Sequence, residues 1–283
     1  MQGVLAYVLR LIAKICGDKM SAHIQANGIS MAYTLDGPAD APVVMFSTSL
    51  MCDHRMWEKQ VAALVPAHQV LRYDTRGHGG SEATSGAYTM DLLADDASSL
   101  LLALGIERVH FVGLSLGGFI AQALALGYPD AVASLVLCGT ACHMPPESIW
   151  DDRIEMARTK GLDPFAKIMI NRWFTESFRD ANPHEMEPVQ AMILGTSVDG
   201  LVGCCHAAKM MNFAAALNDI TAPTLVVVGE HDPGTPVSAA RVLHEGIGKS
   251  ELRIINDAAH LTNIEKPDAF NGVLTEFLAR QTL

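Results

Sequence analysis

The chain has 283 residues, 49% of them hydrophobic and 18% charged, a balance that is typical of a globular enzyme and excludes a disordered or fibrous protein. Its formal net charge of −11 disfavours nucleic acid and anionic membrane surfaces as partners. No two of the six cysteines form a C-x-x-C pair, so we expect reduced thiols in a cytoplasmic protein.

Residues 1–19 are apolar with helical spacing, but Arg10 and Lys14 interrupt the run and no basic segment precedes it. This pattern fits neither a secretory signal nor a membrane span. Two interpretations remain: an amphipathic helix added in front of the domain, or an upstream start codon with Met20 as the first residue of the domain. We favour the second and treat residues 1–19 as an N-terminal extension.

From residue 20 onward, short apolar strands alternate with amphipathic helices. An Asn27-Gly28 pair between two alternating runs within 23–35 predicts an antiparallel hairpin. The strands expected after it cover 43–46, 70–73, 109–112, 134–138, 224–228 and 252–255. The expected helices cover 57–65, 89–104 with Thr89 as N-cap, 119–126, 237–245 and 267–278.

The pattern changes between residues 143 and 218, where no convincing strand occurs and charges, aromatic residues and prolines are frequent. We expect several short helices there. The simplest architecture is an α/β fold with a mostly parallel central sheet and helices on both faces, built from residues 20–140 and 219–283. A helical cap, residues 141–218, is then inserted into this core.

The pattern G-x-S-x-G at residues 113–117 lies between an expected strand and an expected helix. A chain that reverses sharply around one serine forms a nucleophile elbow, which presents a reactive hydroxyl at the end of a strand. Gly113 and Gly117 flank Ser115 because the tight turn around a strained serine leaves no room for a Cβ on either side. Ser115 is therefore the candidate nucleophile.

A serine hydroxyl needs a base to take its proton and a carboxylate to orient that base. Two later strands lead into suitable residues, because 224–228 is followed by Asp232 and 252–255 by His260. The order serine, acid, histidine is the one found where a nucleophile elbow supplies the serine. We predict His260 as general base and Asp232 as its carboxylate, with Glu230 and Asp257 as rival acids.

The oxyanion of a tetrahedral intermediate needs N–H donors. The candidates are the backbone N–H of Leu116, directly after the nucleophile, and that of Leu50, in the loop after strand 43–46. His54 and His78 lie near aspartates in sequence but lack the spacing of a zinc site. No Rossmann or P-loop motif occurs, so we expect no metal and no cofactor.

Several segments resemble the α/β-hydrolase superfamily and, more narrowly, the 3-oxoadipate enol-lactonases of the β-ketoadipate pathway. The resemblance runs from about His23 to the C-terminus and rests on segments 72–79 (RYDTRGHG), 113–118 (GLSLGG), 229–232 (GEHD), 259–265 (AHLTNIE), 172–175 (RWFT) and 203–205 (GCC). The first and the last two of these carry the narrower resemblance. One departure is Met51, where a glycine is expected and where extra bulk would narrow the pocket or shift the loop.

The resemblance implies a cofactor-independent hydrolase that opens 3-oxoadipate enol-lactone to 3-oxoadipate in aromatic catabolism. It implies an arginine fork for the free carboxylate of the substrate, for which Arg153 and Arg172 are candidates, with Trp150 and Trp173 as apolar walls. The expected partner is a small lactone or ester, with no nucleic acid and no membrane, and the sequence allows a homo-oligomer. The alternatives are a carboxylesterase, a lactonase for another ring, a C–C bond hydrolase or a catalytically silent receptor.

Overall fold

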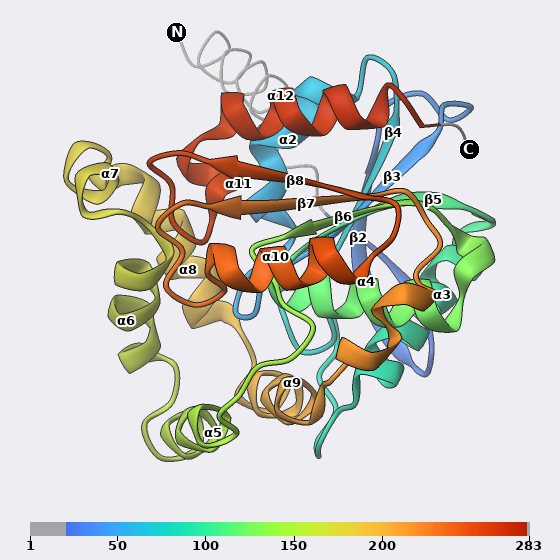
Figure 1. The fold of residues 1–283 in the computed structure, drawn as a ribbon. Coiled ribbons are helices and arrows are strands. Elements are labelled where there is room, and N and C mark those ends of the chain that lie inside the picture. The colour runs from blue at the N-terminus through green and yellow to red at the C-terminus, as the bar shows by residue number, and fades with distance from the viewer. Residues whose placement is uncertain (1–20, 282–283) are drawn as a thin grey trace, which may run out of the picture.

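The computed structural model describes residues 21–281, so the interpretations of residues 1–19 and of Met20 concern a segment outside this range. The described chain forms one sheet of eight strands in the spatial order β1-β2-β4-β3-β5-β6-β7-β8 (Figure 1). The strands are β1 Ala22–Ala26, β2 Ile29–Asp36, β3 Val43–Ser47, β4 Gln69–Tyr73, β5 Val109–Leu114, β6 Val132–Cys138, β7 Thr224–Gly229 and β8 Ser250–Ile255.

The sheet is antiparallel where β2 meets β1 and β4, and parallel at every pairing from β4 to β8. The predicted hairpin is confirmed, since Ala26 pairs with Ile29 and the turn residues Asn27 and Gly28 have φ of 45° and 77°. Positive φ at both turn positions matches the right-handed twist of the two strands. The mostly parallel sheet predicted from the sequence is therefore confirmed as well.

Helices connect the strands at the positions expected from the hydrophobic pattern. The α-helices are α2 Glu58–Leu64, α3 Met90–Leu104, α4 Leu116–Gly127, α5 Ser148–Lys160, α6 Asp163–Trp173, α7 Glu176–Ala181, α8 Met186–Gly195, α9 Val198–Met210, α10 Val237–Gly246, α11 Thr262–Glu265 and α12 Pro267–Leu278. The described residues also form four short 3-10 helices: η1 His54–Trp57, η2 Pro129–Ala131, η3 Pro183–Glu185 and η4 Ala214–Asp219.

Helix α4 begins three residues earlier than predicted, at Leu116, and the start of α2 also differs from the prediction. The helix expected from residue 57 is preceded by the 3-10 turn η1, because Asp53 caps that turn by accepting a hydrogen bond from the Arg55 N–H at 3.0 Å. Thr89 caps α3 as predicted, accepting from the Leu92 N–H at 3.0 Å. Side-chain oxygens at both caps satisfy N–H groups that a helix start leaves without partners.

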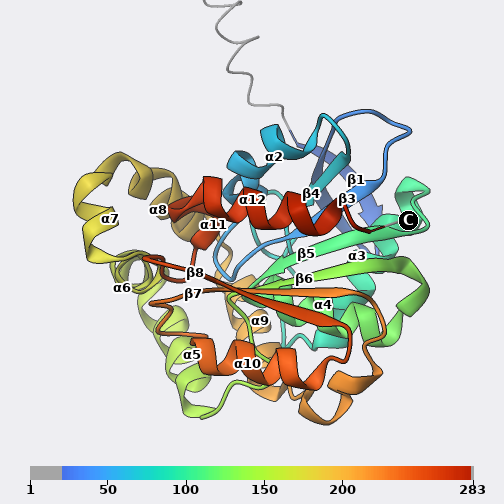
Figure 2. The same cartoon turned by 45° about the horizontal axis from the view of Figure 1, so that its top comes forward.

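The helices form a layer on each face of the sheet. In Figures 1 and 2, α2 and α12 lie together over one face, where they contact each other, and α3, α4 and α10 cover the other. The predicted helices on both faces are confirmed. A strand buried on both sides is expected to be largely apolar, and every residue of β5 and β6 is buried. Their polar residues, His110 and Ser134, lie 2.9 Å apart and bond to each other.

Five helices, α5 to α9, follow one another between β6 and β7, and we call residues 148–210 the helical insertion. They confirm the short helices expected there, and α5 packs against α9 while α6 packs against α8. Figure 1 places α6, α7 and α8 beside the carboxyl ends of β7 and β8. Within residues 21–281 no single helix is long and apolar enough to cross a bilayer, and only the sharply bent pair Pro183–Gly195 and Val198–Met210 reaches that length jointly.

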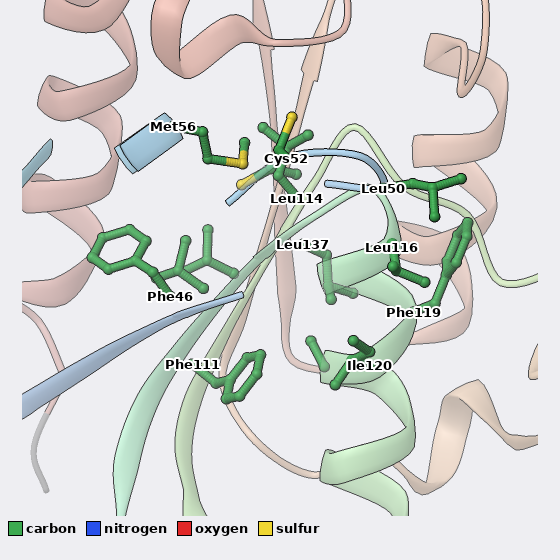
Figure 3. Close-up of a cluster of buried hydrophobic side chains, with 14 of the residues drawn as sticks. Phe46, Leu50, Cys52, Met56, Phe111, Leu114, Leu116, Phe119, Ile120 and Leu137 are labelled. Atoms are coloured by element: carbon green, nitrogen blue, oxygen red, sulfur yellow. The ribbon is translucent and has the colours of Figure 1, made fainter. Parts of the chain in front are cut away.

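A cluster of apolar side chains supports the turn between β5 and α4 (Figure 3). Phe46 on β3, Phe111 on β5 and Ile120 on α4 are each 0% exposed. The ring of Phe46 also contacts that of Trp57, with centroids 4.6 Å apart. Burying one such side chain contributes about 1.5–3 kcal/mol. The strand and helix that flank residue 115 are therefore held firmly in place.

Acidification from pH 7 to 5 is expected to lower the free energy of unfolding through His110 on β5. Burial, with smaller contributions from His68 and Arg108, lowers the pKa of His110 to about 4. An unfolded histidine titrates near 6.5, so between pH 6.5 and 4 the unfolded chain binds more protons and stability falls as pH falls. From pH 7 to pH 5 this effect amounts to about 2 kcal/mol.

Urea unfolding at pH 7 and pH 5 measures this contribution. The variant His110→Gln is expected to reduce the difference between the two pH values, while His231→Gln, which changes an exposed histidine, keeps it. Part of the difference should remain in His110→Gln, because burial also lowers the pKa of His68 and of His78. An unchanged pH dependence in His110→Gln would contradict the assignment.

Candidate active site

The turn between β5 and α4 has the strained geometry of a nucleophile elbow. Ser115 has φ 56° and ψ −112°, in a region that residues with a side chain seldom adopt. A Cβ on Gly113 would lie 2.1 Å from the Gly117 carbonyl oxygen, and one on Gly117 would lie 2.3 Å from that of Ser47. Both positions must therefore be glycine, as the sequence pattern predicts.

Asp232, in the loop after β7, and His260, in the loop after β8, are joined by a hydrogen bond of 2.7 Å between Oδ2 and Nδ1. Asp232 Oδ1 accepts from the N–H groups of Gly234 and Thr235 at 2.8 and 3.0 Å, and Oδ2 from the Thr235 hydroxyl at 2.8 Å. Burial alone would raise the pKa of Asp232, but His260 and these donors hold it below its usual value. The carboxylate is thus fixed in its charged form beside the imidazole.

The rival acids do not reach the imidazole. Glu230 and Asp257 are exposed, and the Asp257 N–H donates to Glu230 Oε2 at 3.1 Å. Asp257 also has a positive φ of 52°, so its side chain belongs to a tight surface turn. Of the three acids considered, Asp232 is the one that the structure places on His260.

The predicted site residues, from the core and from the helical insertion, line one cavity. It contains about 580 Å³ of empty space, including the part that opens to solvent. Its lining consists of Ser49, Leu50, Met51, Ser115, Leu116, Phe119, Met144, Trp150, Arg153, Met169, Arg172, Trp173, Ala208, Asp232, Gly234, Thr235 and His260. All nine site residues predicted from the sequence therefore face the same space.

The two candidate oxyanion donors line this cavity from two elements, the loop after β3 and the start of α4, which are joined by the bond from the Gly117 N–H to the Thr48 carbonyl oxygen at 2.9 Å. Within residues 21–281, no protein acceptor bonds to the N–H of Leu50 or of Leu116. The first N–H groups of a helix have no partner in their own helix and carry its positive dipole end. Both N–H groups are thus free to bind an oxyanion.

The backbone conformation of Met51 explains why a glycine is expected at this position. Its φ is 61°, in the left-handed region that costs a residue with a Cβ about 1–2 kcal/mol. The side chain is 0% exposed and forms part of the cavity wall. Burial of a methionine side chain offsets this strain, since it contributes about 1.5–3 kcal/mol. The chain therefore keeps the loop conformation that a glycine would adopt while filling space in the pocket.

Two arginines give the cavity a cationic side. Arg153 on α5 lies over the ring of buried Trp150, with its Cζ 4.7 Å from the ring centroid, and Arg172 stands near the end of α6. No carboxylate in the described part of the chain lies within ion-pair distance of either guanidinium. Burial lowers the pKa of Arg153, and the charge of Arg172 lowers it further against an opposing effect of Cys205. This cationic side lacks a counter-ion from the protein.

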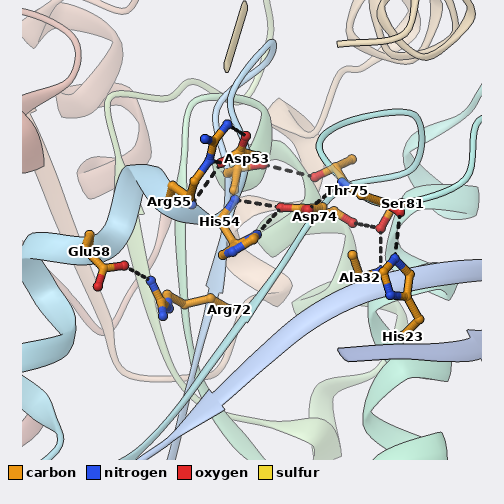
Figure 4. A network of polar contacts seen from close by, with 12 residues as sticks. His23, Ala32, Asp53, His54, Arg55, Glu58, Arg72, Asp74, Thr75 and Ser81 are labelled. Carbon is orange, nitrogen blue, oxygen red and sulfur yellow. Dashed lines mark hydrogen bonds and ion pairs between the residues drawn. The ribbon is translucent and has the colours of Figure 1, made fainter. Parts of the chain in front are cut away.

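Carboxylates and a histidine also meet outside the cavity, where ligand atoms of Asp53, His54 and Asp74 lie within 4.8 Å of one another (Figure 4). The sequence did not predict this grouping, because Asp74 lies 20 residues after His54. His54 Nδ1 lies 2.8 Å from Asp74 Oδ1, and Asp74 Oδ2 accepts from the Gly80 N–H at 2.8 Å. Asp53 is paired with Arg55. The protein's own donors thus occupy these groups, which fasten the loop after β3 to the loop after β4.

Sequence reasoning missed several residues of the site. Thr235 bonds to Asp232 through both its N–H and its hydroxyl, and the signal was available, because an aspartate side chain often accepts the backbone N–H groups of the residues just after it. Met144, Met169 and Phe119 line the cavity, and isolated apolar residues carry no sequence signal that separates a pocket wall from a core position.

The chain matches the model of the alpha/beta hydrolase family over residues 45–273. It is 34% identical over 257 residues to 3-oxoadipate enol-lactonase 2 of Acinetobacter baylyi, covering 91% of this chain and 96% of that protein. It is 31% identical over 250 residues to RutD of Agrobacterium fabrum, a candidate carbamate hydrolase, with 85% and 94% covered. The enol-lactonase structure from Burkholderia xenovorans covers 92% of this chain and 100% of its own, at 35% identity and a TM-score of 0.90. The chain therefore belongs to the alpha/beta hydrolase family and is a hydrolase.

Proposed function

We propose that this hydrolase opens the ring of a small lactone that carries a free carboxylate, and that its substrate is 3-oxoadipate enol-lactone. The observation that carries the proposal is the pair of arginines without acidic partners, in the cavity that also contains Ser115 and His260. An arginine fork binds carboxylates through two parallel hydrogen bonds. The enol-lactonases among its relatives support the same choice.

In the first half of the reaction, His260 takes the proton of Ser115 as the serine oxygen attacks the lactone carbonyl. Asp232 holds the imidazole with Nδ1–H toward itself, so that Nε2 is the basic nitrogen. The N–H groups of Leu50 and Leu116 stabilise the oxyanion. The ring C–O bond then breaks, and His260 passes its proton to the departing enol oxygen.

In the second half, a water molecule replaces the leaving enol. His260 removes a proton from this water, which attacks the acyl-enzyme carbonyl, and the ester bond to Ser115 breaks. The serine oxygen regains a proton from His260, and 3-oxoadipate leaves as its enol, which converts to the ketone. No cofactor enters this sequence. An enol is a good leaving group, so positioning and oxyanion stabilisation supply most of the acceleration.

Replacing Arg153 with methionine is expected to raise KM for the anionic lactone by roughly 10- to 100-fold, with kcat changed far less. A hydrogen bond to a charged group contributes about 1.5–3 kcal/mol, and this one forms in the ground state as well as in the transition state. Methionine keeps an apolar chain against Trp150 but removes the charge. Steady-state kinetics with the lactone and with its neutral methyl ester measure the effect.

The matched control is Arg158→Met, which removes an exposed arginine from the same helix. Its KM for both substrates should equal that of the wild type. The KM for the neutral methyl ester should also stay unchanged in Arg153→Met. Equal losses on the anionic and the neutral lactone would show that Arg153 does not bind the carboxylate, and the proposed substrate class would lose its support.

A further inference from the structure

A buried carboxylate outside the cavity links the helical insertion to the loop of His260. Glu265, the last residue of α11, is 4% exposed. Its Oε1 accepts the N–H of Thr175 at 3.0 Å and the Thr175 hydroxyl at 2.5 Å. Its Oε2 accepts the N–H of Ala259, directly before His260, at 2.8 Å. One side chain thus holds the segment at Thr175, which lies 90 residues before it in sequence, to the segment at Ala259, which lies 6 residues before it.

A second contact joins the same two segments next to the imidazole. The N–H of Leu261 donates to the carbonyl oxygen of Trp173 at 3.1 Å. The Trp173 ring lies over the His260 ring, with centroids 6.4 Å apart and planes inclined by 24°. The N–H groups of both neighbours of His260 are therefore bonded, that of Leu261 to Trp173 and that of Ala259 to the carboxylate that also holds Thr175. The position of the imidazole face depends on where the insertion places Trp173.

The chemistry of this position calls for a carboxylate. Glu265 meets three donors and, within residues 21–281, no cation lies within ion-pair distance of it. An ionised carboxylate only accepts hydrogen bonds, whereas a glutamine amide has one accepting and one donating end. Whichever way that amide turns, its NH2 group faces a backbone N–H, either of Thr175 or of Ala259. A glutamine would therefore push one of the two segments away.

We propose that Glu265 is a positioning residue for His260. It fastens residues 173–175 of the insertion to the loop that carries His260. Trp173 then holds the imidazole plane in the orientation in which Nδ1 bonds to Asp232 and Nε2 faces Ser115. Glu265 itself does not line the cavity. The inference rests on the proposed role of His260 as base, and is independent of which ester or lactone is the substrate.

The matched pair Glu265→Gln and Glu185→Gln tests this inference. Glu185, in η3 of the insertion, also contacts the core, through Lys59 Nζ at 2.7 Å, but in the described part of the chain it has no hydrogen bond to residues 259–261. The readouts are kcat and KM for p-nitrophenyl acetate and the downfield proton resonance of His260 Nδ1–H in its bond to Asp232. We expect Glu265→Gln to lower kcat 10- to 100-fold with KM within threefold, and to broaden or shift the resonance. Glu185→Gln should match the wild type in both.

The Thr175→Val and Thr175→Ser pair gives a second test if Glu265→Gln does not fold. Valine removes the hydroxyl that donates to Glu265, and serine keeps it, so the kcat loss and the altered resonance should appear in Thr175→Val and be restored in Thr175→Ser. The inference is overturned if the Glu265 and Glu185 variants have the same kcat and the same resonance. Because the ester and the resonance do not involve the lactone, a failure of the proposed substrate would leave this comparison intact.

Discussion

Ser115→Ala is expected to lower kcat for ester or lactone hydrolysis by roughly 10⁴- to 10⁶-fold, the loss typical of removing a serine nucleophile. The oxyanion donors and the cavity remain, so a small residual rate should persist. An enol is a better leaving group than an amine, which places the expected loss toward the lower end of this range. Initial rates with the wild type and the variant at saturating substrate give the ratio.

The fold should tolerate this change. Within residues 21–281 the Ser115 hydroxyl makes no hydrogen bond, while the backbone of the same residue bonds to Cys138 and Thr140 at 2.9 Å each. Alanine keeps these backbone contacts and the positive φ. Wild-type and variant thermal unfolding should therefore coincide, and a serine-directed fluorophosphonate should label the wild type alone. If Ser115→Ala retained more than about a tenth of the wild-type activity, Ser115 would not be the nucleophile.

Asp232→Asn is expected to lower kcat by roughly 10⁴-fold, because it favours the wrong tautomer of His260. The asparagine oxygen is best placed where Oδ1 accepts from the N–H groups of Gly234 and Thr235. The amide NH2 then points at His260 Nδ1, which must become an acceptor. The proton moves to Nε2, and the nitrogen that should take the serine proton is no longer basic. Parallel kcat measurements on wild type and variant test this.

The two rival acids supply the controls for this experiment. Glu230→Gln and Asp257→Asn alter exposed side chains with no bond to His260, so each should retain activity within about threefold. If Asp257→Asn were as damaging as Asp232→Asn, the imidazole would have a different partner in the working enzyme. If neither Asp232→Asn nor Asp257→Asn lowered kcat, no carboxylate would orient His260.

The sequence predicted those parts of the site that depend on neighbouring residues. The elbow is determined by five consecutive positions, because the Cβ clashes at Gly113 and Gly117 arise within the turn and the strand beside it. Asp232 and His260 each follow a strand of a parallel sheet, and the carboxyl ends of such strands meet at one edge. Chain order was therefore sufficient to choose His260 and to limit the acid to three candidates, and the bond of 2.7 Å between His260 and Asp232 decides between them.

The remaining parts depend on contacts between distant segments, which no local pattern encodes. Glu265 and Thr175 are 90 residues apart, and their bond exists because the insertion folds back over the last strand. The grouping of Asp53, His54 and Asp74 likewise follows from two loops that meet in space. For Arg153, the sequence indicates charge and helical position, whereas the lack of an acidic partner is a property of the folded surroundings.

The proposed opening of 3-oxoadipate enol-lactone in this cavity can be measured through the ultraviolet absorbance of that lactone, generated in situ. On addition of the wild-type protein we expect a rapid loss of absorbance in proportion to enzyme concentration, and with Ser115→Ala we expect decay at the rate of buffer alone. The contradicting result is decay at the buffer rate with the wild type, while the same preparation cleaves p-nitrophenyl acetate in a Ser115-dependent way. The enzyme would then be a hydrolase of other esters.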